Sequence, residues 1–400
     1  MAGAPAGSAR SADGLLVVHG GGPTAVINAS LYGAVDEALR SPGVGRVLGA
    51  LGGVGGILEG NLVDFSRVPR SELELLPRTP GSAVGTSRKP LEADDYAAIA
   101  CALRREGVRW LLCTGGNGTM DTCGKIWAAC REAGVPVDVV GIPKTMDNDI
   151  AAGDHAPGYA SAARYMAASV AEVCCDVRGL PIHIVVVEAM GRSAGWVTAA
   201  SALADESGAG GPDLIYVPER DFDERAFLDD AQRLIDERGC GVVVVSEGVH
   251  GPGGVPVVPP LMTVGRATYF GDVSAHLAQL VIRELGYKAR SEKPGLLGRA
   301  SMAWQSGLDR EEAIACGREA VRAALEGDSG TMVAIERVSS EPYEARLVRV
   351  PVERVMLEER TLPDEYVNER GNGVTEAFRA WLRPLVGPPL PRFCDLAAGK

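Results

Sequence analysis

The feature that most constrains the fold is a recurring pattern in which a short, buried-type β-branched run leads into glycine or polar residues. In several cases an alanine-rich, helix-like stretch then follows. The runs are Leu15–Val18, Trp110–Cys113, Val139–Ile142, Ile184–Val187 and Val242–Val245. Continuously apolar strands that alternate with helices indicate parallel sheets covered on both faces and built from βαβ units. Ligands of such sheets bind beyond the carboxyl ends of the strands, where these loops lie.

A chain of 400 residues is too long for one small core and predicts two domains. The 51 glycines are nearly twice the usual share of about 7%, which indicates many tight backbone turns. Residues 1–13 lack the hydrophobic segment of a signal peptide and predict a short flexible tail. A helix-like stretch at Asp309–Ala324 and a hairpin at Met332–Val350 are expected near the other end.

The charge balance narrows the class of partner. Acidic residues outnumber basic ones by 52 to 40, so the net charge is −12. Such a chain is a poor general binder of nucleic acid or anionic membrane, and an anionic ligand must be held by local basic groups. No apolar run approaches the ~20 residues that cross a bilayer, and the nine cysteines include no Cys-x-x-Cys pair. We expect a cytoplasmic protein that binds neither nucleic acid nor membrane.

Two glycine-rich loops are candidates for phosphate binding. Gly21 and Gly22 lie in GGGPT, and Gly116, Gly118 and neighbouring residues lie in GGNGTMD. Consecutive backbone N–H groups at the mouth of a helix cradle phosphate, helped by the helix dipole. Such turns can also serve tight packing alone, so the first loop by itself does not establish a phosphate-binding site. Thr119 of the second loop either caps the following helix or contacts a phosphate oxygen.

The segment PKTMDND, from Pro143 to Asp149, is the most informative. Asp147 and Asp149 flank an amide, a spacing that suits magnesium-dependent phosphoryl transfer. One acid accepts a proton from an attacking hydroxyl, and the other helps to hold Mg²⁺. Lys144 supplies a compact positive charge for the transferred phosphate. The alternative is an Asx turn that closes a loop, which is common for Asp-Asn-Asp.

Two further strand ends carry candidate site residues. Met190, Gly191 and Arg192 follow one buried strand, where an arginine stabilises charge on a transferring phosphoryl group. Glu247 ends a four-valine strand and either accepts bonds from sugar hydroxyls or forms a structural ion pair. Arg290 and Arg299 are candidates for an acceptor's phosphate ester, although arginines on a solvated helix have the same sequence pattern.

Together these segments resemble the phosphofructokinase family from about Gly14 to Pro391. The quoted segments are GGGPTAVINAS, PKTMDND, MGRSAGW, SEGV, KARSEKPGLLGR and GNGVTEAF. The likeness is closest to the bacterial pyrophosphate-dependent branch. It implies an α/β fold of two doubly wound Rossmann-like domains with parallel central sheets. Residues 14–158 plus 298–390 would bind the phosphoryl donor, and residues 159–297 would bind the sugar phosphate.

The resemblance also implies roles for individual residues. Asp147 would be the general base on the C1 hydroxyl, with Asp149 assisting and contacting Mg²⁺. Arg192 would stabilise the transition state, and Arg88 would contact the donor's phosphates. The residues that would hold the sugar phosphate are Thr145, Met190, Glu247, Arg299 and, from a neighbouring subunit, Arg290. A site shared in this way implies a homodimer or homotetramer.

The donor, ATP or pyrophosphate, stays open because two positions oppose each other. In the pyrophosphate branch the second glycine loop reads GGND, and its aspartate obstructs the α-phosphate of a nucleotide. Gly118 stands there in this chain, which relieves repulsion of phosphate and favours ATP. Lys144 favours pyrophosphate, because nucleotide-using relatives commonly have glycine at that position. Asn117 replaces the metal-binding aspartate of ATP-dependent members.

The acceptor and the class of activity have alternatives as well. Glu292–Gly295 and Gly298 replace the branch's apolar and amide residues beside the acceptor's phosphate. A sugar phosphate other than fructose 6-phosphate is therefore a live hypothesis. A dehydrogenase would need Gly-x-Gly-x-x-Gly, which Gly20–Thr24 does not supply. A non-catalytic regulatory homologue would be expected to lack Asp147, Asp149 or Arg192.

Overall fold

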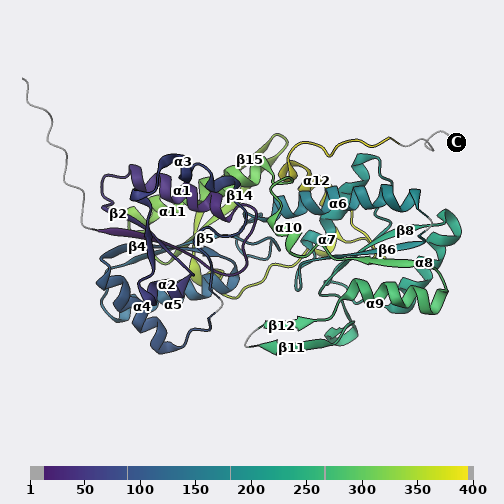
Figure 1. The fold of residues 1–400 in the computed structure, drawn as a ribbon, viewed down its shortest axis with the longest axis horizontal. Coiled ribbons are helices and arrows are strands. Elements are labelled where there is room, and N and C mark those ends of the chain that lie inside the picture. Colours follow the sequence, from purple (N-terminus) through teal and green to yellow (C-terminus); the bar gives the residue numbers. More distant parts are fainter. Residues whose placement is uncertain (1–12, 88, 181, 265–266, 395–400) are drawn as a thin grey trace, which may run out of the picture.

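The computed structural model describes residues 13–87, 89–180, 182–264 and 267–394, and two sheets organise them (Figure 1). The first has seven strands in the order β15-β14-β5-β4-β1-β2-β3. Its five central strands are parallel, and β3 and β15 run antiparallel at the two edges. Their bounds are β1 (Gly14–His19), β2 (Arg46–Ala50), β3 (Leu62–Asp64), β4 (Val108–Gly115), β5 (Asp138–Pro143), β14 (Thr331–Ser340) and β15 (Tyr343–Pro351).

Helices cover both faces of the first sheet (Figure 1). On one face lie α1 (Ile27–Arg40) and α11 (Gly307–Leu325), with α3 (Arg70–Leu73) beside them; on the other lie α2 (Val54–Glu59), α4 (Ala93–Arg105) and α5 (Asn117–Glu132). Side chains of β1 alternate between the faces, so Leu15 and Val17 pack with α1 and α11. Leu16 and Val18 pack with α4 and α5. Burial on both faces explains the continuous apolar runs in the sequence.

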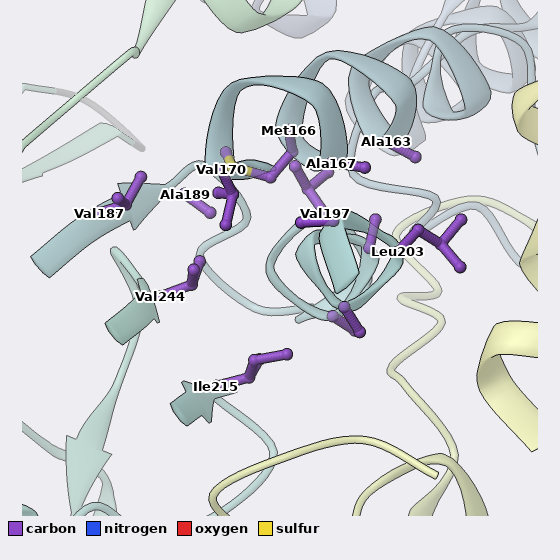
Figure 2. Packing of buried hydrophobic residues seen from close by; sticks show 14 of the residues in the cluster. Ala163, Met166, Ala167, Val170, Val187, Ala189, Val197, Leu203, Ile215 and Val244 are labelled. Atoms are coloured by element: carbon purple, nitrogen blue, oxygen red, sulfur yellow. The ribbon is translucent and has the colours of Figure 1, made fainter. Parts of the chain in front are cut away.

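The second sheet has four parallel strands in the order β13-β6-β8-β7. They are β6 (Ile184–Ala189), β7 (Leu214–Tyr216), β8 (Gly241–Ser246) and β13 (Ala289–Glu292). One face carries α6 (Tyr159–Gly179) and α7 (Trp196–Ala200), and the other carries α8 (Glu224–Arg238) and α9 (Val273–Leu280) (Figure 1). Figure 2 shows Val187 and Val244 of the sheet facing Met166 and Val170 of α6.

Short elements complete the described chain. Two antiparallel pairs join β9 (His250–Gly251) to β10 (Val255–Pro256) and β11 (Pro260–Val264) to β12 (Ala267–Phe270). Single helical turns occur at Phe65–Arg67, Leu76–Arg78, Pro252–Gly254, Val281–Leu285, Val352–Arg354 and Asp364–Tyr366. No helix of the described residues is both long enough and apolar enough to span a membrane.

The predicted α/β class with two doubly wound, mainly parallel sheets is confirmed. In the second half α7 ends at Ala200, and a 3-10 helix continues over Ser201–Ser207. The Ser201 hydroxyl donates to the Thr198 carbonyl at 2.6 Å. Such side-chain bonds compete with the α-helical pattern and favour a tighter turn.

The C-terminal third divides between the two sheets. The hairpin β14–β15 joins the first sheet, and α11 packs on it. The helices α10 (Leu296–Ala300) and α12 (Glu376–Val386) instead contact α6, and Phe378 and Leu382 lie in the core of the second half. The chain thus does not keep residues 298–390 wholly with residues 14–158. Which half binds the donor and which the acceptor stays a prediction.

The contact between α1 and α11 depends on two glycines. A Cβ at Gly317 would lie 2.1 Å from the Ser30 carbonyl oxygen, and one at Gly33 would lie 2.1 Å from that of Ile314. Only residues without a Cβ let the two backbones approach so closely. We therefore expect Gly317→Ala to cost about 1–3 kcal/mol through overpacking.

The measurement is the urea midpoint of unfolding, followed by circular dichroism. Gly307→Ala, at the start of the same helix, is the matched control because nothing lies within 4 Å of its added Cβ. Its midpoint should stay the same or rise slightly, since alanine favours helix. Equal midpoints for both variants would contradict the close-packing argument.

Candidate active site

The site is built where the carboxyl ends of strands from both sheets meet. From the first sheet come the loops after β1, β4 and β5, and from the second those after β6 and β8. Gly191 follows β6 with φ +122°, and a Cβ built on it would lie 4.0 Å from Asp147 Oδ1. Because Asp147 belongs to the loop after β5, this contact joins the two halves of the chain. The predicted loops therefore converge.

Lys144 connects the first glycine loop to the segment Pro143–Asp149, which contains both site aspartates. Its backbone N–H donates to the Gly115 carbonyl at 3.0 Å, and its side chain is buried at 4% exposure. The Nζ atom donates to the carbonyl of Gly22 and would lie 3.6 Å from a Cβ on Gly21. The ammonium is thus held beside the backbone amides that were predicted to bind phosphate.

Thr119 fills the space between the two glycine loops. A Cβ on Gly115 would lie 2.1 Å from Thr119 Oγ1, and one on Gly20 would lie 2.3 Å from it. The glycines therefore allow the loops after β1 and β4 to touch through this threonine. Gly116 lies beside the Lys144 carbonyl, whereas Gly118 is exposed with open space around it. A side chain at position 118 would extend into that space.

The two carboxylates are held differently. Asp149 Oδ1 accepts from the Thr145 hydroxyl at 2.7 Å, and its Oδ2 accepts from Asn117 Nδ2 at 3.1 Å. The Thr145 hydroxyl also accepts from the backbone N–H of Asp147 at 3.1 Å. Asp147 Oδ1 is buried and has no hydrogen-bond partner among the described residues. Hydrogen bonds therefore fix the Asp149 carboxylate, while one oxygen of Asp147 accepts no hydrogen bond from the described residues.

The surroundings of Asp147 raise its pKa to about 7. Burial is the main cause, because it disfavours the charged form, and the negative charges of Asp149 and Glu247 add to it. Lys144 and Arg192 act in the opposite direction. A carboxylate with a pKa near neutral pH is well matched to proton transfer.

Residues after β6 and β8 form the opposite wall. Arg192 and Glu247 line a cavity of about 340 Å³, and Met190 packs partly against the core beneath. The Gly191 N–H points at Glu247 Oε1, 3.5 Å away, at the limit of hydrogen bonding. A Cβ on Gly248 would lie 1.7 Å from the Arg192 carbonyl oxygen, so the two loops touch through backbone.

Ser246 is a site residue that the sequence reasoning missed. Its hydroxyl donates to the Gly191 carbonyl at 2.6 Å and accepts from the Gly248 N–H at 3.0 Å. It thereby ties the β6 and β8 loops together beneath Arg192. A serine at the end of a buried valine strand, directly before Glu247, was the available signal.

The three arginines besides Arg192 have different positions. Arg299, on α10, lies beside the first glycine loop, since its Nη1 would be 2.7 Å from a Cβ on Gly22. Arg290 is exposed on the edge strand β13, pairs in register with Val185 and lines a separate hollow. Within one chain it is not brought to the cleft. Arg88 lies outside the described residues.

The donor set around Asp149 fits a magnesium ion. Asn117 Oδ1 is buried without a hydrogen-bond partner among the described residues, and the Asp149 carboxylate lies beside the same amide. Mg²⁺ prefers oxygen ligands and uses one or two protein groups together with waters and substrate phosphates. Within the described ranges no group of three or more His, Cys, Asp or Glu side chains could hold a metal alone.

Glycine-rich loops and the Asp147 carboxylate lie together at the carboxyl ends of one parallel sheet, next to strand ends of a second α/β half, and this arrangement is typical of a phosphotransferase. The family model for phosphofructokinase matches residues 14–324. The chain belongs to the phosphofructokinase family.

Three relatives illustrate this membership. A pyrophosphate–fructose 6-phosphate 1-phosphotransferase of Xanthomonas campestris is 38% identical over 391 residues, covering 94% of this chain and 92% of that protein. A sulfofructose kinase of Alkalicoccus urumqiensis is 35% identical, covering 92% and 94%. The crystal structure of a pyrophosphate-dependent phosphofructokinase from Marinobacter aquaeolei superposes with a TM-score of 0.85 at 30% identity, covering 96% and 94%.

We expect kcat/KM to rise with pH through about 7, because Asp147 accepts a proton only when it is ionised. Below its pKa the group is protonated and inactive. Glu247→Gln removes one of the like charges that raise the pKa of Asp147, so the acid limb should move to lower pH. Asp147→Asn should lower kcat by about 10²–10⁴-fold above pH 7, where the wild-type carboxylate is ionised, and by less at lower pH. An acid limb that stays in place in Glu247→Gln would contradict the electrostatic assignment.

Proposed function

We propose that the protein is a magnesium-dependent phosphotransferase that moves a phosphoryl group to the C1 hydroxyl of fructose 6-phosphate or a related ketose phosphate. The observation that carries the proposal is the partly exposed carboxylate of Asp147, whose Oδ1 atom is buried. It has an unpartnered oxygen and a pKa of about 7 where the loops of both sheets meet. A structural aspartate in an Asx turn would instead have its oxygens satisfied by local N–H groups.

In this mechanism Asp147 takes the proton from the attacking hydroxyl. Lys144 and Arg192 supply positive charge on the donor and acceptor sides of Asp147 and oppose charge that develops during transfer. Asp149 and Asn117 would hold Mg²⁺ together with the donor's phosphates. The ion, when bound, neutralises charge on the phosphoryl oxygens.

The remaining residues would bind the two substrates. Backbone amides around Gly21, Gly22 and Gly116 suit the donor's phosphates, with Thr119 keeping the loops together. Thr145, Met190, Gly191 and Glu247 lie on the side of Asp147 where the sugar would be held, and Arg299 would bind its phosphate ester. Arg290 faces outward at a sheet edge, so its part in binding would require a second copy of the chain. A cytoplasmic homodimer or homotetramer accords with this arrangement.

The geometry around Gly118 favours ATP as the donor. Among the described residues, no atom lies within 4 Å of a Cβ built at this exposed position at the start of α5. A larger donor meets neither bulk nor a carboxylate there. Repulsion between a carboxylate and a nucleotide's α-phosphate is thus absent.

Pyrophosphate is the second candidate, and Lys144 supports it. Its buried ammonium rests on the Gly22 carbonyl and takes up space beside the first glycine loop. A compact point charge in a narrow site suits a small donor of high charge density. Several relatives at 34–38% identity are named pyrophosphate–fructose 6-phosphate 1-phosphotransferase, which also supports pyrophosphate as the donor.

The test is phosphoryl transfer to fructose 6-phosphate with Mg²⁺, run in parallel with ATP and with pyrophosphate. We expect ATP to be used, and Gly118→Asp to lower kcat/KM for ATP by about 10-fold or more through charge repulsion. Gly118→Asn is the matched control, since it adds similar bulk without charge. Turnover with pyrophosphate alone would overturn the ATP assignment and leave the phosphotransferase activity in place.

The identity of the acceptor is tested with the same assay, because the predicted acceptor loop differs from that of the pyrophosphate branch. In this loop Lys293 forms an ion pair with the buried Glu188 at the end of β6. If fructose 6-phosphate gives no product with either donor, longer ketose phosphates and a ketose sulfonate should be tried. The name of the sulfofructose kinase relative motivates the latter. No transfer to any of them would contradict the proposed function.

A further inference from the structure

Asn148 lies between the two site carboxylates in an unusual backbone conformation. Its φ is +55°, in the left-handed region, where asparagine is among the few tolerated non-glycine residues. The side chain is 1% exposed, and its Oδ1 accepts from the Ala156 N–H at 3.0 Å. This hydrogen bond leads away from the cleft, into the segment that follows the catalytic loop. The amide is enclosed by protein, and its Nδ2 has no hydrogen-bond partner among the described residues.

The segment that receives Asn148 is itself firmly held. The Thr145 N–H donates to the Pro157 carbonyl at 3.1 Å, so the catalytic loop and this segment run side by side. Gly158 N–H donates to Asp309 Oδ1 at 2.8 Å, which attaches the segment to α11. Displacing it would shift both ends of the loop that carries Asp147.

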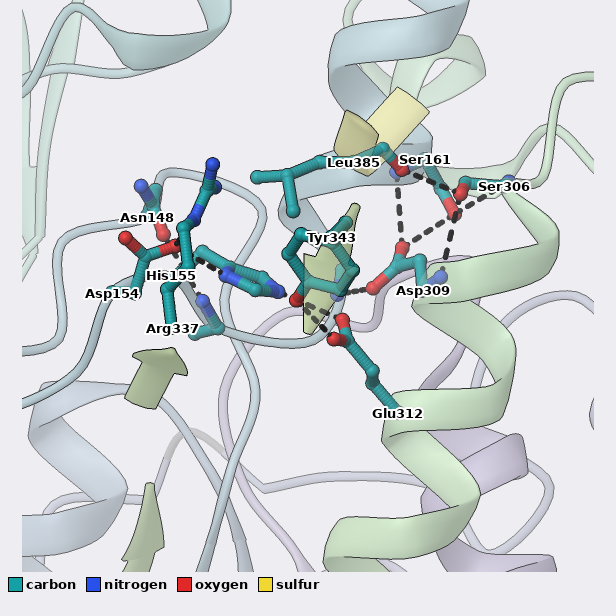
Figure 3. Close-up of polar contacts among 12 residues, drawn as sticks. Asn148, Asp154, His155, Ser161, Ser306, Asp309, Glu312, Arg337, Tyr343 and Leu385 are labelled. Carbon is teal, nitrogen blue, oxygen red and sulfur yellow. Dashed lines mark hydrogen bonds and ion pairs between the residues drawn. The ribbon is translucent and has the colours of Figure 1, made fainter. Parts of the chain in front are cut away.

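His155 is the main anchor, as Figure 3 shows. Its side chain is fully buried, with Nδ1 2.8 Å from Asp154 Oδ2 and Nε2 2.7 Å from Glu312 Oε2. Burial alone would lower the pKa of His155, but the bonds to Asp154 and Glu312 outweigh it and raise the pKa to about 9. The imidazole is therefore positively charged at neutral pH and bridges two carboxylates.

Other elements complete the surroundings of His155. The hairpin supplies Arg337, 3.0 Å from Asp154 Oδ2, and Tyr343, which donates to Glu312. Trp381 of α12 donates to Asp154 Oδ1 at 3.0 Å. Arg360 donates to the Gly153 carbonyl at 3.0 Å. Segments from four parts of the chain thus fix Gly153, Asp154 and His155, which directly precede Ala156.

We propose that Asn148 is a positioning residue whose left-handed backbone and hydrogen bond to Ala156, anchored by the ion-paired His155, fix the relative orientation of the Asp147 and Asp149 carboxylates. The inference rests on the proposed function for its kinetic consequences. The orientation itself is a property of the free protein and is testable without turnover.

The first test separates the two features of Asn148. Asn148→Ala loses both the hydrogen bond and the preference for positive φ, whereas Asn148→Gly loses only the bond. We expect kcat to fall about 10²-fold in the alanine variant, as misplaced catalytic groups do, and less in the glycine variant. KM for donor and acceptor should change less than about 3-fold, because the Asn148 amide is enclosed by protein.

Ala152→Gly is the control variant. Ala152 also has a positive φ, +65°, shortly after Asp149 in the chain, but its methyl side chain forms no hydrogen bond that the substitution could remove. Its kcat should equal that of the wild type. Unchanged kcat in Asn148→Ala, in an enzyme whose wild type turns over, would overturn the positioning role and leave the proposed function standing.

Crystal structures of the wild type and Asn148→Ala provide the activity-independent readout. We expect the Asp147 carboxylate to be displaced relative to Asp149 in the variant. Carboxylates that keep their positions would overturn the inference even if the wild type showed no turnover. Absence of turnover with a displaced carboxylate would instead count against the proposed function alone.

His155→Gln tests the anchor through pH. In the wild type, kcat should fall as pH rises through about 9, because His155 loses its proton and leaves two carboxylates facing a neutral ring. The stability it contributes is fully present below about 6.5 and is lost over the same rise. The glutamine variant should have a lower kcat and no such limb near pH 9. An unchanged limb would overturn the assignment to His155.

A double variant measures whether the two residues act together. If His155 works through Asn148, the kcat loss in Asn148→Gly with His155→Gln should be smaller than the product of the single losses. Losses that multiply would show that His155 stabilises the fold without positioning the carboxylates. Circular dichroism of each variant checks that the fold is retained.

Discussion

A carboxylate buried without a hydrogen-bond partner is energetically costly, and the arrangement around Asp147 depends on how that cost is offset. Two like charges and burial favour its protonated form, while Lys144 and Arg192 favour its charged form. The balance gives a pKa near 7, so one aspartate is ready to exchange a proton. Its neighbour Asp149 has both oxygens engaged. Two acids that are two residues apart are thereby given different tasks by their surroundings.

The loops around Asp147 approach one another closely, and glycines make this approach possible. A Cβ on Gly20 or Gly115 would clash with Thr119. A Cβ on Gly191 would lie 4.0 Å from Asp147 Oδ1, in ordinary contact. The glycines of this family member thus allow two sheets to present five strand ends to one cleft. Close packing and phosphate binding compete as explanations of a glycine loop in the sequence; these contacts show the close packing, and phosphate binding stays a prediction.

Charged residues around His155, outside the site itself, hold the segment that follows Asp149 in place. His155 lies in a network that joins the catalytic segment to α11, to the hairpin β14–β15 and to α12. Buried ion pairs contribute little net stability when compared with apolar packing, but they require a defined geometry between their partners. The ion pairs of His155 therefore suit a segment that holds the Asp147 loop in one orientation.

The sequence by itself determined the fold class and five of the sheet strands, whose following loops converge in the structure. Runs such as Leu15–Val18 and Val242–Val245 are local and continuous, so burial on both faces of a parallel sheet could be predicted from them. The edge strand Ala289–Glu292 was missed because it is partly exposed and has no apolar run. The helix Glu376–Val386 docks on α6 from far along the chain, which no local pattern encodes.

Only the tertiary structure decided how the site residues act. The pKa of Asp147 depends on Glu247, which is 100 positions distant and belongs to the other sheet. The charge on His155 likewise depends on Glu312, which lies on α11 far along the chain. The sequence supplies the types of side chain that can do this chemistry. Burial, distance and opposing charge, which select what each one does, exist only after distant segments have come together.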